Sequence, residues 1–266
     1  MSLSIFFVIV LTFLINLITT LSYSVRIVGI RTGRVAISFA LFNILVLISR
    51  TANGFQAPLL ASTIEKNIKM GIGSNLFDFR LIIFSCTVAT IVGALLIPSF
   101  QRILSVAVNR FSVYKSMPKV LYYGFTKGGI AYLKENIVAP DVKNITQLDF
   151  KENFPWRVFI MNIVAVAIIT VGVISSLYAG YLNPDLRTTS STLSSVINGL
   201  ATILMFVFID PFLSMMTDEV VLGKCKESVF RKYIVYMVVA RVLGTLVAQL
   251  LFIPAAKLIA MFSGVL

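Results

Sequence analysis

Charged side chains inside apolar stretches are the residues of this sequence that could do chemistry. Arg50 lies within an apolar run, about 24 Å along a helix from Arg34. A guanidinium in hydrocarbon is costly, so it normally faces a cavity or a partner. Arginine also binds phosphate through two hydrogen bonds and keeps its charge at any pH. We therefore expect Arg50 to contact an anion in transit, or else to form a structural ion pair or helix-end cap near Glu65.

Polar and small residues accompany Arg50 at helical spacing. Asn43, Asn53 and Ala57 fall with Arg50 on one face of a predicted helix, and the opposite face is aliphatic. Gln56 flanks this stripe. The pattern predicts a substrate-binding surface that contains Arg50, Asn43, Asn53 and Gln56.

Asp210 and Arg241 form a second candidate group, because they lie at similar depths in consecutive apolar runs. Similar depth predicts an ion pair between the two helices, since pairing removes most of the cost of burying either charge. Such a pair is either structural or a switch that an anion or a proton opens. Arg241 and Gln249 share one helix face and join the substrate-binding candidates. Asp210 is a candidate for gating or ion coupling.

Prolines interrupt two of the apolar runs at matching places, Pro58 and Pro211. Proline removes an intrahelical hydrogen bond, so we expect each helix to kink or break there. Paired interruptions are typical of a transport pathway, which makes both prolines gating candidates. The alternative is a simple kink that the membrane tolerates.

These residues must be positioned by helices that cross a bilayer. Of the 266 residues, 58% are hydrophobic and 13% are charged, whereas soluble domains contain about 25% charged residues. The apolar residues gather into runs of about 20 residues or more, enough to cross the hydrocarbon core. We therefore predict an all-α polytopic membrane protein with six transmembrane helices, near residues 2–25, 35–64, 81–104, 158–182, 191–217 and 234–262.

Basic residues set the expected topology. The net charge is +12, and most of the 23 Lys and Arg residues lie in the first, third and fifth connections. These connections should therefore be cytoplasmic, with both termini outside. The charge indicates contact with anionic phospholipids and not nucleic acid. Connection 105–157 interleaves aromatic residues with lysines, which predicts a basic interfacial segment in the headgroup layer, or else a solvated loop that serves topology alone.

The two halves of the chain resemble each other weakly. Aligned in order, Tyr23 falls on Tyr178 and Thr90 falls on Thr245. Halves with an odd number of helices must have opposite orientations, as in the inverted repeats of many transporters. We predict a first three-helix repeat over 1–104, a cytoplasmic interfacial connection over 105–157 and a second three-helix repeat over 158–266.

Several classes of function are excluded by missing residues. The sequence contains no histidine, which excludes His-dependent phosphatases, HExxH proteases and His triads, and it lacks the GxxxxGK[ST] loop that binds ATP. Cys86 and Cys225 have no metal-like spacing. We expect no enzymatic activity, no cofactor and no metal site.

A family resemblance lies in the run LSYSVRIVGIRTGRVAISFALFNILVLISRTANGFQAPLL, residues 21–60. This run resembles the Amj family, alternate bacterial lipid II flippases that can stand in for MurJ, and the length and six-helix count fit that family. The resemblance implies that the substrate is lipid II, the undecaprenyl-pyrophosphate-linked precursor of peptidoglycan. It also implies a multi-pass protein of the bacterial cytoplasmic membrane. It carries no site motif, so the candidate residues rest on the physical argument.

Three hypotheses remain open from the sequence. The first is a lipid II flippase that works by alternating access of two inverted halves. The second is a transporter of another anion, such as undecaprenyl phosphate or a small metabolite, because intramembrane arginines fit it equally. The third is a non-transporting scaffold for envelope assembly, in which the polar residues only hold helices together.

Overall fold

The computed structural model describes residues 2–73, 75–124, 126–138, 140 and 154–265. All regular structure in these residues is helical, and six helices are long and apolar enough to cross a membrane. The predicted all-helical, six-span architecture is therefore confirmed. The spans are α1 (Leu3–Thr32), α2 (Val35–Lys69), α3 (Leu76–Tyr114), α7 (Trp156–Leu182), the composite fifth span Pro184–Val221, and α10 (Glu227–Ser263).

Several helices extend beyond their predicted bounds. The first span was expected to end near residue 25, but α1 continues to Thr32. It ends at Gly33, which adopts a left-handed conformation with φ 65°, and the Arg34 N–H donates to the Gly29 carbonyl at 2.9 Å. Glycine favours this helix-ending geometry because it has no Cβ.

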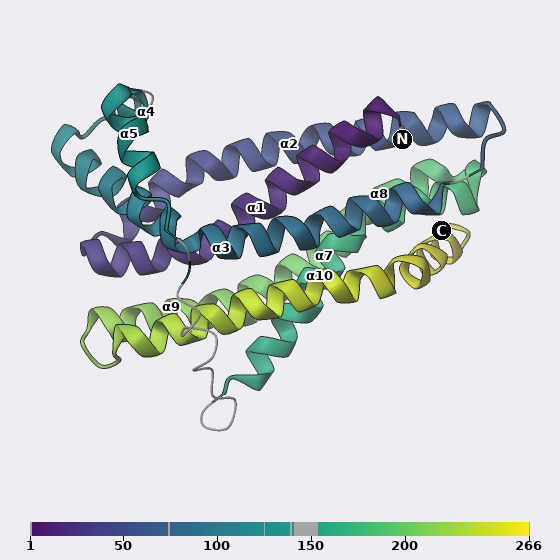
Figure 1. Cartoon of the computed structure of the whole chain (residues 1–266). Helices are drawn as coiled ribbons and strands as arrows, with labels where there is room; N and C mark the ends of the chain where they lie inside the picture. Colours follow the sequence, from purple (N-terminus) through teal and green to yellow (C-terminus); the bar gives the residue numbers. More distant parts are fainter. Residues whose placement is uncertain (1, 74, 125, 139, 141–153, 266) are drawn as a thin grey trace.

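The helices form two groups with the same packing scheme (Figure 1). In the first group α1 packs along both α2 and α3, and in the second α7 packs along both α10 and α8 (Arg187–Leu204). Contacts between the groups run chiefly through α3 and α10, with α2 touching α7 and α1 touching α9 (Asp210–Val221). The N-terminus and the C-terminus lie toward the same end of the bundle.

Glycines allow the closest helix approaches in each group. A Cβ added at Gly93 of α3 would lie 2.8 Å from the Thr20 Cβ of α1. A Cβ added at Gly244 of α10 would lie 2.8 Å from both the Ile163 carbonyl oxygen and the Val166 Cβ of α7. Small residues at membrane helix interfaces permit such packing, which supplies dispersion energy where no hydrophobic driving force exists. The first helix of each group is thereby fixed against the third.

The fifth span is interrupted next to its proline, as predicted. A π-helical segment, η2 (Met205–Ile209), separates α8 from α9, and Pro211 is the second residue of α9. A π turn inserts one residue into the helical repeat, so α9 is rotated by about 100° relative to a continuous helix. The second span differs, because α2 is one helix through Pro58. The expected interruption is therefore found at Pro211, whereas α2 continues through Pro58 without a break.

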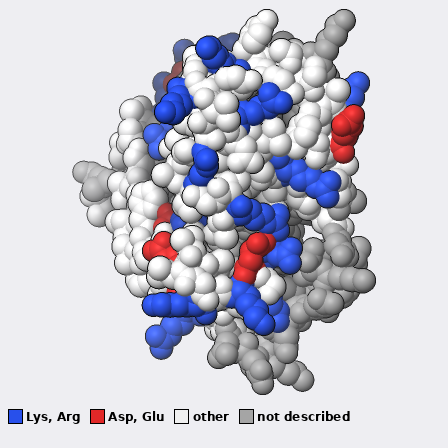
Figure 2. All heavy atoms as spheres, turned by 90° about the vertical axis from the view of Figure 1, so that its left-hand side faces the viewer, with Lys and Arg blue, Asp and Glu red and all other residues white. Residues whose placement is uncertain are grey.

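Basic side chains gather at one end of the bundle. Figure 2 shows Lys and Arg concentrated on the end that carries the α1–α2 and α9–α10 connections. The short helices α4 (Met117–Gly124) and α5 (Lys127–Glu135) project from the same end. Within the predicted connection 105–157, residues 105–114 belong to α3, and residues 141–153 lie outside the described residues.

The glycine contacts lead to a stability prediction. Gly244→Ala should lower the free energy of unfolding by about 1–3 kcal/mol, because the added methyl group overlaps α7. Gly199→Ala is the matched control, since a Cβ at Gly199 of α8 meets no atom within 4 Å. Thermal unfolding in detergent should show a lower Tm for Gly244→Ala alone. Equal Tm values for the two variants would contradict the close α7–α10 packing.

Candidate functional site

One face of α2 carries polar and small residues along most of its length and an aromatic residue, Phe39, near its start. Phe39, Asn43, Arg50, Ala57 and Ala61 recur at separations of four or seven residues, which places them on a single helix face. We call these residues the α2 face. Asn43 and Arg50 are exposed, and Phe39, Ala57 and Ala61 are half-buried. The α2 face therefore borders the bundle without being packed into it.

Arg50 makes no hydrogen bond or ion pair with any residue that the structure describes. The alternative role in an ion pair with Glu65 is not found, because Glu65 pairs with Arg187 of α8. Asn53 is exposed like Arg50. An exposed arginine in the middle of a span needs a counter-ion, and a substrate anion could supply one.

A second polar face lies on α8. Its members recur at separations of three or four residues and are exposed or half-buried, and we call them the α8 face: Thr188, Ser191, Ser195, Asn198 and Thr202. The exposed apolar residues Val196, Leu200 and Ile203 lie on a different side of the same helix. The helix thus separates a polar surface from one suited to lipid.

A pocket connects the two faces at the end of the bundle away from the basic residues. Ala61 of the α2 face and Thr188 and Ser191 of the α8 face line this pocket, and Leu177 and Gly180 of α7 border it. Arg187 and Glu65 also line it, and the Arg187 Nε lies 3.8 Å from the Glu65 Oε1. The α2 and α8 faces therefore approach each other beside α7 at this pocket.

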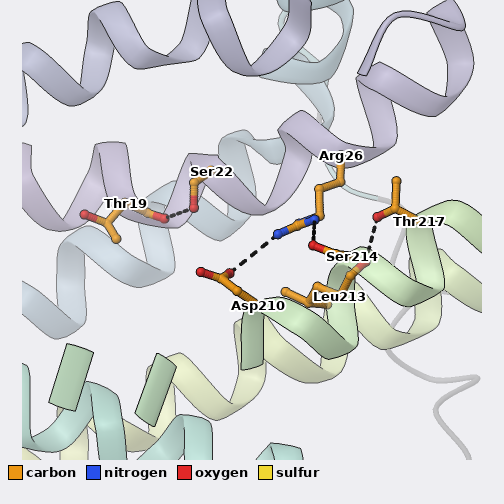
Figure 3. Close-up of polar contacts among 7 residues, drawn as sticks. All are labelled: Thr19, Ser22, Arg26, Asp210, Leu213, Ser214 and Thr217. Carbon is orange, nitrogen blue, oxygen red and sulfur yellow. Dashed lines mark hydrogen bonds and ion pairs between the residues drawn. The ribbon is translucent and has the colours of Figure 1, made fainter. Parts of the chain in front are cut away.

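Arg26 of α1 contacts α9 and α2 near the basic end (Figure 3). Its Nη1 donates to the Ser214 Oγ at 2.9 Å, and its Nη2 lies 3.5 Å from the Asp210 Oδ1. Its guanidinium also lies over the Phe39 ring of the α2 face, 5.2 Å from the ring centre. Thr19 and Ser22 lie on the same stretch of α1. Arg26 of α1 thus contacts both α2 and α9.

The predicted pair between Asp210 and Arg241 is wrong. The π turn rotates α9, and Asp210 meets Arg26 of α1. Arg241 is 6% exposed and turns toward α1, where its Nε donates to the Thr20 Oγ1 at 3.2 Å and its Nη2 donates to the Asn16 Oδ1 at 3.3 Å. Among the described residues Arg241 has no carboxylate partner. It is a buried cation held by neutral oxygens.

The remaining candidates have local structural contacts. Gln56 is buried, and its Nε2 donates to the Thr12 Oγ1 of α1 at 2.9 Å. The Gln249 Nε2 donates to the Arg80 carbonyl oxygen of α3 at 3.0 Å. These amides tie neighbouring helices together, and neither forms a cluster with Arg50 on the α2 face. Among the described residues there is no group of three or more His, Cys, Asp or Glu side chains that could hold a metal ion.

Sequence reasoning missed Arg26 and the α8 face. Arg26 was placed just beyond the predicted end of the first span, in a loop, because the helix was assumed to stop at its apolar boundary. The α8 face has the same periodic signal that identified Arg50. Applying the spacing test to the Ser and Thr residues at 188–202 would have found it.

These features define an integral membrane protein of six helices, with polar faces on two of its peripheral helices and ion pairs at both ends. The sequence matches the family described as "Amj: Alternate to MurJ" over residues 11–263. It is also 38% identical over 248 residues, 93% of this chain and 92% of the relative, to the "Lipid II flippase Amj" of Bacillus subtilis (strain 168). No solved structure matches it. The chain belongs to the Amj family, which confirms the resemblance seen in the sequence.

The polar faces can be tested by cysteine accessibility in a Cys225→Ser background, where the buried Cys86 remains. Gly54→Cys, adjacent to the α2 face, and Ser195→Cys should react with a membrane-impermeant maleimide. Their sequence neighbours Phe55→Cys and Val196→Cys should react at least about tenfold more slowly, because the reactive thiolate forms in water and not in lipid. Equal maleimide reaction rates for the two cysteines of each neighbouring pair would contradict access of water to the α2 and α8 faces.

Proposed function

We propose that this protein is a lipid II flippase of the bacterial cytoplasmic membrane. The observation that carries the proposal is Arg50, which is exposed in the middle of the α2 face and pairs with none of the residues that the structure describes. Membership of the Amj family and the relative named "Lipid II flippase Amj" support the substrate. The protein acts as a transporter and not as an enzyme.

The two polar faces suit a substrate with an anionic head and a long apolar tail. The diphosphate and sugars of lipid II require water, hydrogen bonds and fixed cations, whereas its prenyl tail is as apolar as the bilayer. The α2 and α8 faces offer amides, hydroxyls and Arg50, and they lie on helices with lipid-facing sides. The head group moves between these faces while the tail stays in lipid.

Alternating access by two inverted halves is the mechanism we propose, with repeats over 1–104 and 158–266. The shared packing scheme of the two helix groups supports it. A close-contact glycine near the end of the first helix of each half supports it as well: a Cβ at Gly29 would lie 2.7 Å from Val35, and a Cβ at Gly180 would lie 3.2 Å from Arg187. Each glycine thus lets the second helix of its half start close against the first. Pro58 and Pro211 mark corresponding places in those second helices.

The basic end of the bundle faces the cytoplasm in this proposal. Basic connections are retained on the cytoplasmic side of bacterial membranes, so both termini lie outside. Helices α4 and α5, which belong to segment 105–157, lie in the headgroup layer, where each Lys or Arg near an anionic phospholipid contributes about 1 kcal/mol. This segment gathers anionic lipids at the side where lipid II is made.

Arg241 provides a second cation inside the bundle. Because its described partners are neutral, its positive charge is not cancelled locally and attracts a diphosphate in transit. Asp210 controls access through its partner Arg26. Asn43 and Asn53 are exposed and supply hydrogen bonds to the head group. Gln249 becomes available when the halves move apart, because it is bonded to Arg80 of the other half, and Gln56 becomes available when α2 moves away from Thr12 of α1.

A second candidate function is transport of another polyprenyl phosphate, and Arg50 favours it equally because a guanidinium binds any phosphate. A scaffold role is favoured less, since it gives no reason for an exposed arginine in the middle of a span.

Substitution of Arg50 tests the function in cells that lack other lipid II flippases. Arg50→Ala should reduce lipid II export by about tenfold or more, because a charge-assisted contact contributes about 1.5–3 kcal/mol. Arg50→Lys should retain part of the export. Lys66→Ala, which removes an exposed cation of α2 outside the α2 face, is the control. Normal export by a correctly inserted Arg50→Ala protein would contradict the role of Arg50.

A further inference from the structure

Two of the three described ion pairs that join the halves lie near opposite ends of the bundle; the third, between Arg31 of α1 and Glu227 of α10, is at the basic end. Arg26 of α1 meets Asp210 of α9 near the basic end, and Arg187 of α8 meets Glu65 of α2 near the other end. Each of these two pairs follows the same plan. An arginine close to the junction of the first and second spans of one half reaches a carboxylate on the second span of the other half.

In both pairs the N–O distances are long enough for the arginine to exchange its carboxylate for another anion. The closest N–O distances are 3.5 Å for Arg26 and Asp210 and 3.8 Å for Arg187 and Glu65. The Asp210 and Glu65 side chains are 41% and 48% exposed. The Arg187 side chain is 39% exposed, and an ion pair exposed on both sides contributes little to stability. The Arg26 side chain is only 14% exposed, so Arg26 leaves Asp210 only when another anion takes its place.

Each arginine also borders one end of the proposed path. Arg26 contacts Phe39 of the α2 face and the Ser214 hydroxyl. Arg187 lines the pocket that contains Thr188 and Ser191 of the α8 face. A phosphate that reached either arginine would find a guanidinium and at least one nearby hydroxyl group.

We propose that Arg26 and Arg187 are exchangeable binding sites for the diphosphate of a lipid-linked substrate, one at each end of the path. In the resting protein a carboxylate of the opposite half occupies each site. The diphosphate carries more charge than one carboxylate and accepts bidentate hydrogen bonds from the guanidinium, so it displaces the carboxylate. This inference rests on the proposed function and names the groups that receive the substrate.

Displacement of the carboxylate has a mechanical consequence. The pair between Arg26 and Asp210 links α1 to α9, and the pair between Arg187 and Glu65 links α8 to α2. Capture of a diphosphate at one end removes one link between the halves at that end, while the pair between Arg31 and Glu227 at the basic end and the pair at the other end persist. Binding therefore weakens the contact between the halves on the side where the substrate enters, as alternating access requires.

Binding of farnesyl diphosphate to the purified full-length protein tests the proposal, with farnesol as the uncharged control ligand. The double variant Arg26→Gln with Arg187→Gln should bind about tenfold more weakly or worse, the loss expected for charge-assisted contacts. The matched control, Arg34→Gln with Lys69→Gln, removes the same charge from exposed positions near the same two ends. It should stay within about twofold of the wild type, because exposed and distant charges are screened.

Removal of the competing carboxylates should have the opposite effect. Asp210→Asn with Glu65→Gln should strengthen binding of farnesyl diphosphate by about tenfold, because the guanidinium groups no longer have an anionic partner. A misfolded protein cannot produce this gain. The substitutions are nearly isosteric and leave Arg26 and Arg187 in place.

Two results would overturn the proposal. One is an equal loss of binding in the arginine variant and in its matched control, and the other is unchanged or weaker binding after the carboxylates are removed. Neither result depends on lipid II transport. A protein that behaves as expected toward farnesyl diphosphate but does not export lipid II in cells would contradict the proposed function alone.

Discussion

The cost of placing a charged group in hydrocarbon governs how this protein uses its arginines. Each guanidinium near the bilayer must find a counter-ion, a set of neutral dipoles, or water. Arg26 and Arg187 take carboxylates from the opposite half, and Arg241 takes the oxygens of Asn16 and Thr20. Arg50 has no such protein partner in the described residues and faces outward from the bundle. These four arginines therefore range from ion-paired (Arg26 and Arg187), through hydrogen-bonded to neutral oxygens (Arg241), to one without a partner among the described residues (Arg50).

Helix packing makes these different environments possible. The first helix of each half is held tightly against the third, with glycines at the contact, and the second helix of each half is more peripheral. Because the second helices carry the polar faces and both carboxylates of the ion pairs, the functional groups lie on the more loosely packed elements. The first and third helices of each half therefore form a rigid pair beside a less constrained second helix. Such an arrangement suits motion of one half relative to the other, because packed cores have discrete arrangements and do not deform continuously.

Much of the architecture could be predicted from the sequence, because long apolar runs and basic connections are strong, local signals. The six spans and the interruption at Pro211 are of this kind. Contacts between distant segments could not be predicted in the same way. Pairing Asp210 with Arg241 rested on similar depth, and depth does not determine which neighbouring helix a carboxylate faces: Asp210, next to the π turn, faces Arg26 of α1. Gln56 was assigned to the substrate surface because spacing cannot distinguish a side chain buried against Thr12 from one that faces a path.

The central claim is that this protein moves a lipid-linked diphosphate between leaflets along the α2 and α8 faces. Leaflet-resolved accessibility of lipid II in vesicles, with and without the purified protein, tests this claim most directly. The account predicts that the wild-type protein makes inner-leaflet lipid II accessible from outside and that Arg50→Ala protein, inserted at the same level, does so far more slowly. Lipid II that stays in its original leaflet in the presence of folded wild-type protein would contradict the account.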